Sequence, residues 1–135
     1  MTLIIPSISN ETILKFIFGK LEAPNTQTLR LFKNNHNPSK NTIISSLEEA
    51  TQPGYTSKNL NASDWAVVTT GGITTALHPE HQFIFTGAAT LYGYYVTTNV
   101  DGNNYLLWAE KFTNAPFILP PNGGSISVNL NIGVS

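Results

Sequence analysis

The chain has 135 residues, of which 41% are hydrophobic and only 11% are charged. This length provides one hydrophobic core, and the apolar content argues against a disordered chain. The 7 Lys and Arg residues against 8 Asp and Glu residues give a formal net charge of −1. Because no basic field is available for a phosphate backbone, we expect no nucleic-acid partner. The chain has no cysteine, which excludes disulfides, thiolate metal sites and a cysteine nucleophile.

The start of the chain does not resemble a targeting segment. No basic residues precede its apolar side chains, and Pro6 interrupts them, so no signal peptide is predicted. The uninterrupted apolar runs are far shorter than the about 20 residues that span a bilayer. We therefore expect no membrane partner. Residues 1–9 are predicted to be an N-terminal arm, and residues 10–135 a single domain.

One short helix is predicted directly after the arm. Asn10 suits the N-cap and Gly19 suits a left-handed stop. Between them, apolar side chains recur at helical spacing. These side chains are Ile13, Leu14, Ile17 and Phe18. A strand is the competing interpretation, because Ile and Phe also favour sheets.

The rest of the chain consists of short apolar runs separated by turn residues. Residues 43–50 are predicted as a strand or a single helical turn. The predicted strands cover residues 28–32, 55–60, 65–70, 74–77, 82–86, 91–98, 105–112 and 125–132. Short strands at regular spacing favour a sandwich over a parallel sheet. We therefore predict a mainly β, single-domain antiparallel β-sandwich, jelly-roll or immunoglobulin-like, with one short N-terminal helix.

The strongest predicted element is a long hairpin over residues 91–112, which reverses at Asp101-Gly102. Strict alternation predicts which side chains share a face. In the first strand one face has Tyr92, Tyr94 and Val96, and the other has Leu91, Tyr95 and Thr97. In the return strand one face has Leu106, Trp108, Glu110 and Phe112.

A metal site is the first chemistry to consider. His78-Pro-Glu-His81, together with His36, offers imidazole and carboxylate ligands. However, Pro79 prevents a regular helix, so the spacing does not bring ligands to one helical face. A polar loop before the strand at residues 82–86 explains the motif, and we predict no metal ion.

Glu110 is the only candidate for acid catalysis. It lies between Trp108 and Phe112 in an apolar strand, where burial would raise its pKa. An ion pair with Lys or Arg, or a hydrogen bond to the backbone, is the simpler interpretation. Serine-hydrolase and nucleotide-binding motifs are not found in the sequence. We therefore predict no catalytic residue, no cofactor and no enzymatic activity.

Several short segments, taken in order, resemble a group of small virion proteins of tailed bacteriophages and prophages. The similarity covers residues 12–128. Its segments are residues 29–38, 47–50, 54–55, Trp65, residues 91–96 and residues 107–112. The family offers no catalytic residues to transfer to this chain. The resemblance implies a component of the phage particle.

Among particle components, the resemblance and the composition favour a capsid decoration, or cement, protein. Such a protein would bind the outer shell and bridge neighbouring capsomers. Its expected partners are the major capsid protein and copies of itself, with a trimer as one option. It would be assembled in the host cytoplasm and located in the virion. The expected contact residues are Leu3, Ile4, Ile5 and Ile8 of the arm, with Tyr92 and Tyr94 of the hairpin. An edge strand or folded-back tail is the alternative for the arm.

Two other functions remain open from the sequence. The first is a tail, fibre or baseplate module that binds host glycans through loops at residues 34–41 or 99–104. There, aromatic rings and asparagine side chains would contact the sugar. The second is a small hydrolase that uses Glu110 as its acid.

Overall fold

The computed structural model describes residues 3–22 and 26–134. Its elements are β1 (Leu3–Ile4), α1 (Ser7–Ile17), β2 (Thr26–Phe32), η1 (Ile44–Ser46), β3 (Lys58–Asn61), η2 (Ala62–Asp64), β4 (Ala66–Thr70), β5 (Ile73–Phe85), β6 (Ala89–Leu91), β7 (Gly93–Val100), β8 (Asn103–Lys111), β9 (Phe117–Leu119) and β10 (Gly124–Val134). Two of them, η1 and η2, are single turns of 3-10 helix.

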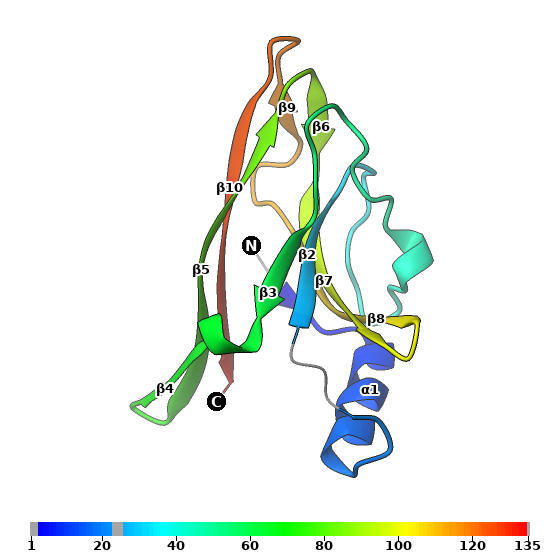
Figure 1. Ribbon diagram of the computed structural model, residues 1–135, viewed down its shortest axis with the longest axis vertical. Coiled ribbons are helices and arrows are strands. Elements are labelled where there is room, and N and C mark those ends of the chain that lie inside the picture. The colour runs from blue at the N-terminus through cyan, green and yellow to red at the C-terminus, as the bar shows by residue number, and fades with distance from the viewer. Residues whose placement is uncertain (1–2, 23–25, 135) are drawn as a thin grey trace.

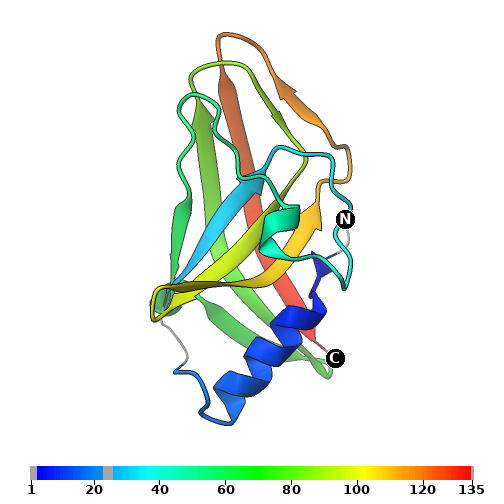
Figure 2. The same cartoon turned by 90° about the vertical axis from the view of Figure 1, so that its right-hand side faces the viewer.

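The strands form three antiparallel sheets. Sheet A has the order β1-β8-β7-β2-β3, sheet B the order β10-β5-β4, and a small third sheet pairs β6 with β9. Sheet B lies against one face of sheet A, and α1 and η1 lie on the other side (Figures 1 and 2). The predicted mainly β antiparallel sandwich with one N-terminal helix is confirmed.

The main core fills the space between sheets A and B. Alternation directs Leu29 and Leu31 of β2 and Val96 of β7 toward it, and all three are fully buried. From sheet B it receives Phe83, Phe85, Ile126, Val128 and Leu130. The predicted alternation of residues 125–132 is thus confirmed for its first three apolar positions, which face this core.

A second, smaller cluster covers the opposite face of sheet A. It contains Phe32, Leu47, Tyr95, Leu106 and Ala109, so sheet A is packed on both sides. This burial raises the pKa of Tyr95 to about 12.

An ion pair ties the segment that carries Leu47 to sheet A. Nη1 of Arg30 lies 2.7 Å from both carboxylate oxygens of Glu49, and Nε of Arg30 donates to Oγ1 of Thr97 at 3.1 Å. Because the pair is only partly exposed, water screens it less than an ordinary surface pair.

The helix begins earlier than its sequence predicts. Pro6 occupies the N-cap, and Ser7 opens the first turn, so the prediction that Asn10 caps the helix is wrong. Pro6 is extended, with φ −63° and ψ 157°, and its carbonyl oxygen accepts from the N–H groups of Ser9 at 2.9 Å and Asn10 at 3.3 Å, so it is the last residue before the first helical turn. The left-handed residue that follows the helix is Gly19, with φ +68°, as expected.

A β-bulge changes the faces predicted for the long hairpin. Val96 pairs with Trp108, but Thr97 pairs with Leu106, so Leu107 is an extra residue in β8. Consequently Trp108 packs against the main core, whereas Leu106 lies in the second cluster. The prediction that these two side chains share one face is wrong.

A second bulge explains why β5 continues through a proline. Val128 pairs with His81 and Leu130 with His78, so Pro79 and Glu80 together oppose a single residue of β10. Pairing with β4 ends at Leu77, so the proline interrupts no ladder there. The prediction of two short strands separated by a loop at residues 78–81 is wrong, because one strand of 13 residues runs through them.

Candidate functional site

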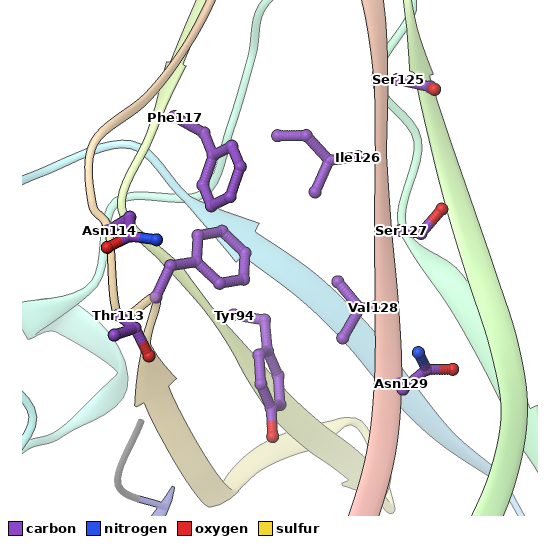
Figure 3. A pocket seen from close by; sticks show the side chains of 10 residues that line it. Tyr94, Thr113, Asn114, Phe117, Ser125, Ile126, Ser127, Val128 and Asn129 are labelled. Carbon is purple, nitrogen blue, oxygen red and sulfur yellow. The ribbon is translucent and has the colours of Figure 1, made fainter.

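A pocket of about 400 Å³ opens between β10 and the segment that follows β8. The side chains of Tyr94, Phe117, Ile126 and Val128 point into it (Figure 3). None of the residues that line it has a carboxylate, imidazole, amine or guanidinium group. The pocket therefore suits apolar contact and offers no acid–base pair or metal ligands.

Glu110 lies outside the lining of this pocket. It pairs with Tyr94 across β7 and β8, and its residue exposure is 8%. Burial raises the pKa of its carboxyl. No hydrogen bond or ion pair joins its side chain to another described residue, so the expected pairing with Lys or Arg is not formed there. Its raised pKa is explained by desolvation alone.

The predicted contact residues of the arm lie in β1, at the start of α1 and between the two. Leu3 and Ile4 form the edge strand β1 and pair with Glu110 and Ala109 of β8. Ile5 and Ile8 are both exposed. The described part of the arm is thus an edge strand followed by the first residues of α1, and these two isoleucines are available to a partner.

The two tyrosines predicted at the interface lie in different parts of the protein. Tyr92 lies between β6 and β7, is partly buried, and packs against the second cluster. Tyr94 is 2% exposed and belongs to the main core. Tyr92 lies outside both strands, so alternation along one strand does not apply to the two side chains. The placement of Tyr94 on an interface is therefore corrected, because its side chain has almost no surface to offer.

The loops considered for glycan binding use their asparagines within the protein. Nζ of Lys111 donates to Oδ1 of Asn35 at 2.6 Å and to Oδ1 of Asn37 at 2.8 Å. Nδ2 of Asn99 donates to Oδ1 of Asn104 at 3.1 Å. These amides brace the two loops, which leaves less of their hydrogen-bonding capacity for a ligand.

The helix α1 packs against its own protein through polar side chains. Ser9 and Thr12 are its buried residues, and Oγ of Ser9 donates to the carbonyl oxygen of Leu106 in β8 at 2.6 Å. Thr12 instead bonds within the helix, to the carbonyl oxygen of Ile8 at 3.1 Å. Phe16, four residues after Thr12, is partly buried. The face that anchors α1 therefore consists of two small polar residues and one aromatic residue near the end of the helix.

The apolar face of α1 points away from the protein. We call Ile13, Leu14, Ile17 and Phe18 the α1 stripe; the side chains of Ile17 and Phe18 are 68% and 72% exposed. A surface helix normally buries its apolar stripe, so this orientation is reversed. Within the described residues, no helix is long and apolar enough to cross a membrane. The α1 stripe is the strongest candidate for a contact with another protein.

A second exposed apolar surface lies on the hairpin of β4 and β5, which projects from the sandwich on the side away from α1 (Figure 1). Val67, Val68, Ile73 and Leu77 are its exposed apolar side chains. Residues 66–77 include no ionisable side chain. This hairpin is therefore both apolar and electrically neutral.

The two histidines of the bulged segment stack on each other. Because the bulge adds one residue between them, His78 and His81 face the same side of β5; their ring centroids lie 4.9 Å apart and His81 Nε2 is 3.1 Å from His78 Nδ1. His36 bonds to Thr42 instead. No group of three His, Cys, Asp or Glu side chains occurs among the residues with a described position.

We expect acid to destabilise the protein through this pair. Burial first, then the neighbouring His78 and Lys58, lower the pKa of His81, while Asp64 opposes them. A lowered histidine pKa means that the unfolded chain binds more protons, so the free energy of unfolding falls as the pH drops below about 6.5. Urea unfolding at a series of pH values between 8 and 5.5 measures this slope.

A matched pair of variants isolates the contribution of His81. His81→Gln should flatten the slope, and Ile118→Gln, which changes an exposed residue and removes no titratable group, should leave it unchanged. Glu110 acts in the opposite direction, because a raised carboxyl pKa loses stability as the pH rises above 4.5. That contribution is common to all three proteins and cancels in the comparison. An equal slope in His81→Gln and the unaltered protein would exclude His81 as the source.

Comparisons of the chain with models of protein families, with curated proteins and with solved structures found no match. The resemblance to phage virion proteins therefore stays a prediction from the sequence.

The residues of the α1 stripe are recognisable in the sequence, but the orientation of the stripe is not. Apolar spacing identifies a stripe on a helix and does not say whether the protein itself covers it. One sequence signal for the orientation is the helix face opposite the α1 stripe. Ser9 and Thr12 lie on that face, and small polar residues are unusual on the face that a helix turns toward an apolar core. The neutral hairpin at residues 66–77 was visible in the sequence as a run without charge.

Proposed function

We propose that this chain is a structural protein of a tailed-bacteriophage particle. In this proposal it is a capsid decoration protein, which binds the outer shell through the α1 stripe and bridges neighbouring capsomers. The observation that carries the proposal is the reversed helix: Ser9 and Thr12 are buried against the protein, while Ile17 and Phe18 are exposed. A helix with this orientation leaves its apolar side chains for a partner.

The energetics support a role that depends on many copies. Full burial of a side chain such as Ile17 or Phe18 is worth about 1.5–3 kcal/mol. A single contact of this size is modest, but a shell presents the same site many times, and bridging links each contact to a second one. The net charge of −1 causes little repulsion between copies that sit close together.

The partner would be the major capsid protein, through an apolar groove on the outside of the shell. Ile8 in the first turn of α1 and Ile5 just before the helix are also exposed, so they extend the contact toward the arm. The pocket, whose lining has no carboxylate, imidazole, amine or guanidinium group, and the internally bonded asparagines favour this role over the hydrolase and the glycan-binding module. The protein would be found in the virion.

A co-sedimentation experiment tests the proposal. Shells assembled from the major capsid protein of the same genome are mixed with the purified chain and pelleted. We expect the unaltered protein to pellet with the shells. Ile17→Asp and Phe18→Asp should each weaken binding by about tenfold or more, because each leaves a charge in an apolar contact. Neither should change the melting temperature by more than a few degrees, since both side chains are exposed.

The matched control is Ile118→Asp, which introduces the same charge at a 72% exposed position on β9. It should bind shells as the unaltered protein does. Binding that is unaffected by both α1 variants would contradict the proposed contact, and no binding of the unaltered protein would contradict the decoration role. A density map of the intact particle gives an independent test, because density restricted to the tail would favour the tail-module alternative.

A further inference from the structure

The outer edge of β4 is open for pairing with another strand. β4 is the last strand of sheet B, and β5 is its one partner within the described residues. One row of its backbone N–H and C=O groups therefore faces outward. Such a row is a ready template for a further strand.

β4 has none of the features that usually protect an edge. Its sequence is Ala-Val-Val-Thr-Thr, without lysine or proline. Its register with β5 is continuous from Ala66 opposite Leu77 to Thr70 opposite Ile73, so no bulge twists the edge away. All five of its residues are exposed. Proteins that remain monomeric normally block an edge of this kind.

From this edge we infer that two copies of the chain pair antiparallel through β4, centred on Val68. The three-stranded sheets of the two copies then join into one continuous sheet. Centring on Val68 pairs all five residues, because Val68 is the middle residue of Ala66–Thr70. Val68 meets its equivalent in the second copy, and Val67 meets Thr69.

The charge distribution favours a second copy as the occupant. In a two-fold contact the residues at the axis face their own equivalents, so a charge there would face a like charge. Residues 66–77 include no ionisable side chain, and no such repulsion arises. The edge of sheet A differs, because β3 begins with Lys58.

The side chains beside the edge extend the contact. Val68, Ile73 and Leu77 line a hollow of about 400 Å³ on one face of the hairpin. A two-fold axis perpendicular to the joined sheet places this hollow on the same face in both copies. The two hollows then lie side by side, and the contact includes apolar side chains as well as backbone hydrogen bonds. The α1 stripe takes no part, so this inference does not depend on the proposed binding to a shell.

A single-cysteine experiment tests the contact and its register. Because the chain has no cysteine, Val68→Cys carries one thiol. Directly opposed residues of an antiparallel pair have Cβ atoms about 4.5–5.5 Å apart, close enough for a disulfide with a small adjustment. Under mild oxidation we expect Val68→Cys to form about tenfold more covalent dimer than Ile118→Cys, the exposed control on β9. Equal yields would overturn the inference.

Sedimentation equilibrium provides the second readout. The unaltered protein should show a concentration-dependent dimer, and Val68→Lys should raise its Kd by about tenfold or more, because two lysines would then face each other. Ile118→Lys and Ile17→Asp should dimerise normally. A monomer at all concentrations, a trimer, or unchanged dimerisation of Val68→Lys would overturn the inference. If the unaltered protein dimerised but did not pellet with the shells, the proposed function alone would be contradicted.

Discussion

Gly93→Ala is expected to destabilise the protein by about 3 kcal/mol or more and to lower its melting temperature by about 10 °C. Gly93 lies in a central strand, paired with Phe32 of β2 and Lys111 of β8. A Cβ atom at this position would overlap the carbonyl oxygen of Glu110 and lie 2.5 Å from Cζ of Phe32. Phe32 is fully buried, so neither its ring nor the neighbouring backbone can move aside cheaply.

Gly133→Ala is the matched control for this variant. Gly133 also lies in a strand, but the nearest atom to an added Cβ is Cγ2 of Ile73 at 3.8 Å, an ordinary contact. We expect a change below about 1 kcal/mol. Thermal melting followed by circular dichroism measures both variants. If Gly93→Ala melted within two or three degrees of Gly133→Ala, the close approach of β7 to its neighbours would be refuted.

Phe83→Ala should cost about 3–5 kcal/mol, because it removes one of the largest side chains of the main core. Phe83 is 1% exposed. Its ring stacks on Tyr55 with centroids 5.9 Å apart, and Nζ of Lys58 lies 5.6 Å from its centroid. The substitution would leave a cavity between the two sheets, so the cost exceeds the simple loss of buried area.

The adjacent residue provides the control. Ile84 lies on the opposite face of β5 and is 59% exposed, so Ile84→Ala should change stability by less than about 1 kcal/mol. Equilibrium unfolding in urea measures the free energy of unfolding of both variants. The two changes lie in the same strand and introduce the same residue, alanine. Similar losses from the two variants would mean that Phe83 does not lie between the sheets.

The sandwich was predictable because its signals are local. Asp101 and Gly102 both have positive φ, at 51° and 83°, which is the conformation that their residue types favour in a hairpin turn. The alternation at Ile126, Val128 and Leu130 identified a strand with one buried face. These features depend on residues near each other in the chain, so the sequence alone contains them.

The errors arose where pairing partners decide the outcome. The bulge at Leu107 depends on the register between β7 and β8, and no local pattern marks it. Pro79 is tolerated in a long strand because β4 has already ended beside it. Both facts concern a neighbouring strand, and single-sequence patterns do not describe neighbours.

Apolar spacing alone does not predict the orientation of α1, for a similar reason. Its apolar spacing is equally compatible with packing against its own sheet or against another protein. The hydrogen bond from Ser9 to Leu106 decides which face is turned inward, and it joins residues that are far apart in the chain. The candidate site therefore emerged from tertiary structure, although every residue in it was visible in the sequence.

The extra residue at Pro79–Glu80 also separates the outer half of β5 from its inner half. Because side chains alternate along a strand, shortening the chain by one residue at this point would turn the whole projecting tip over and exchange the sides on which Val67 and Val68 lie. The buried pattern from Phe83 onward would remain as it is. An insertion or deletion of one residue at this place would thus change which side chains the tip of β4 and β5 exposes on each side. The core of the sandwich would stay the same.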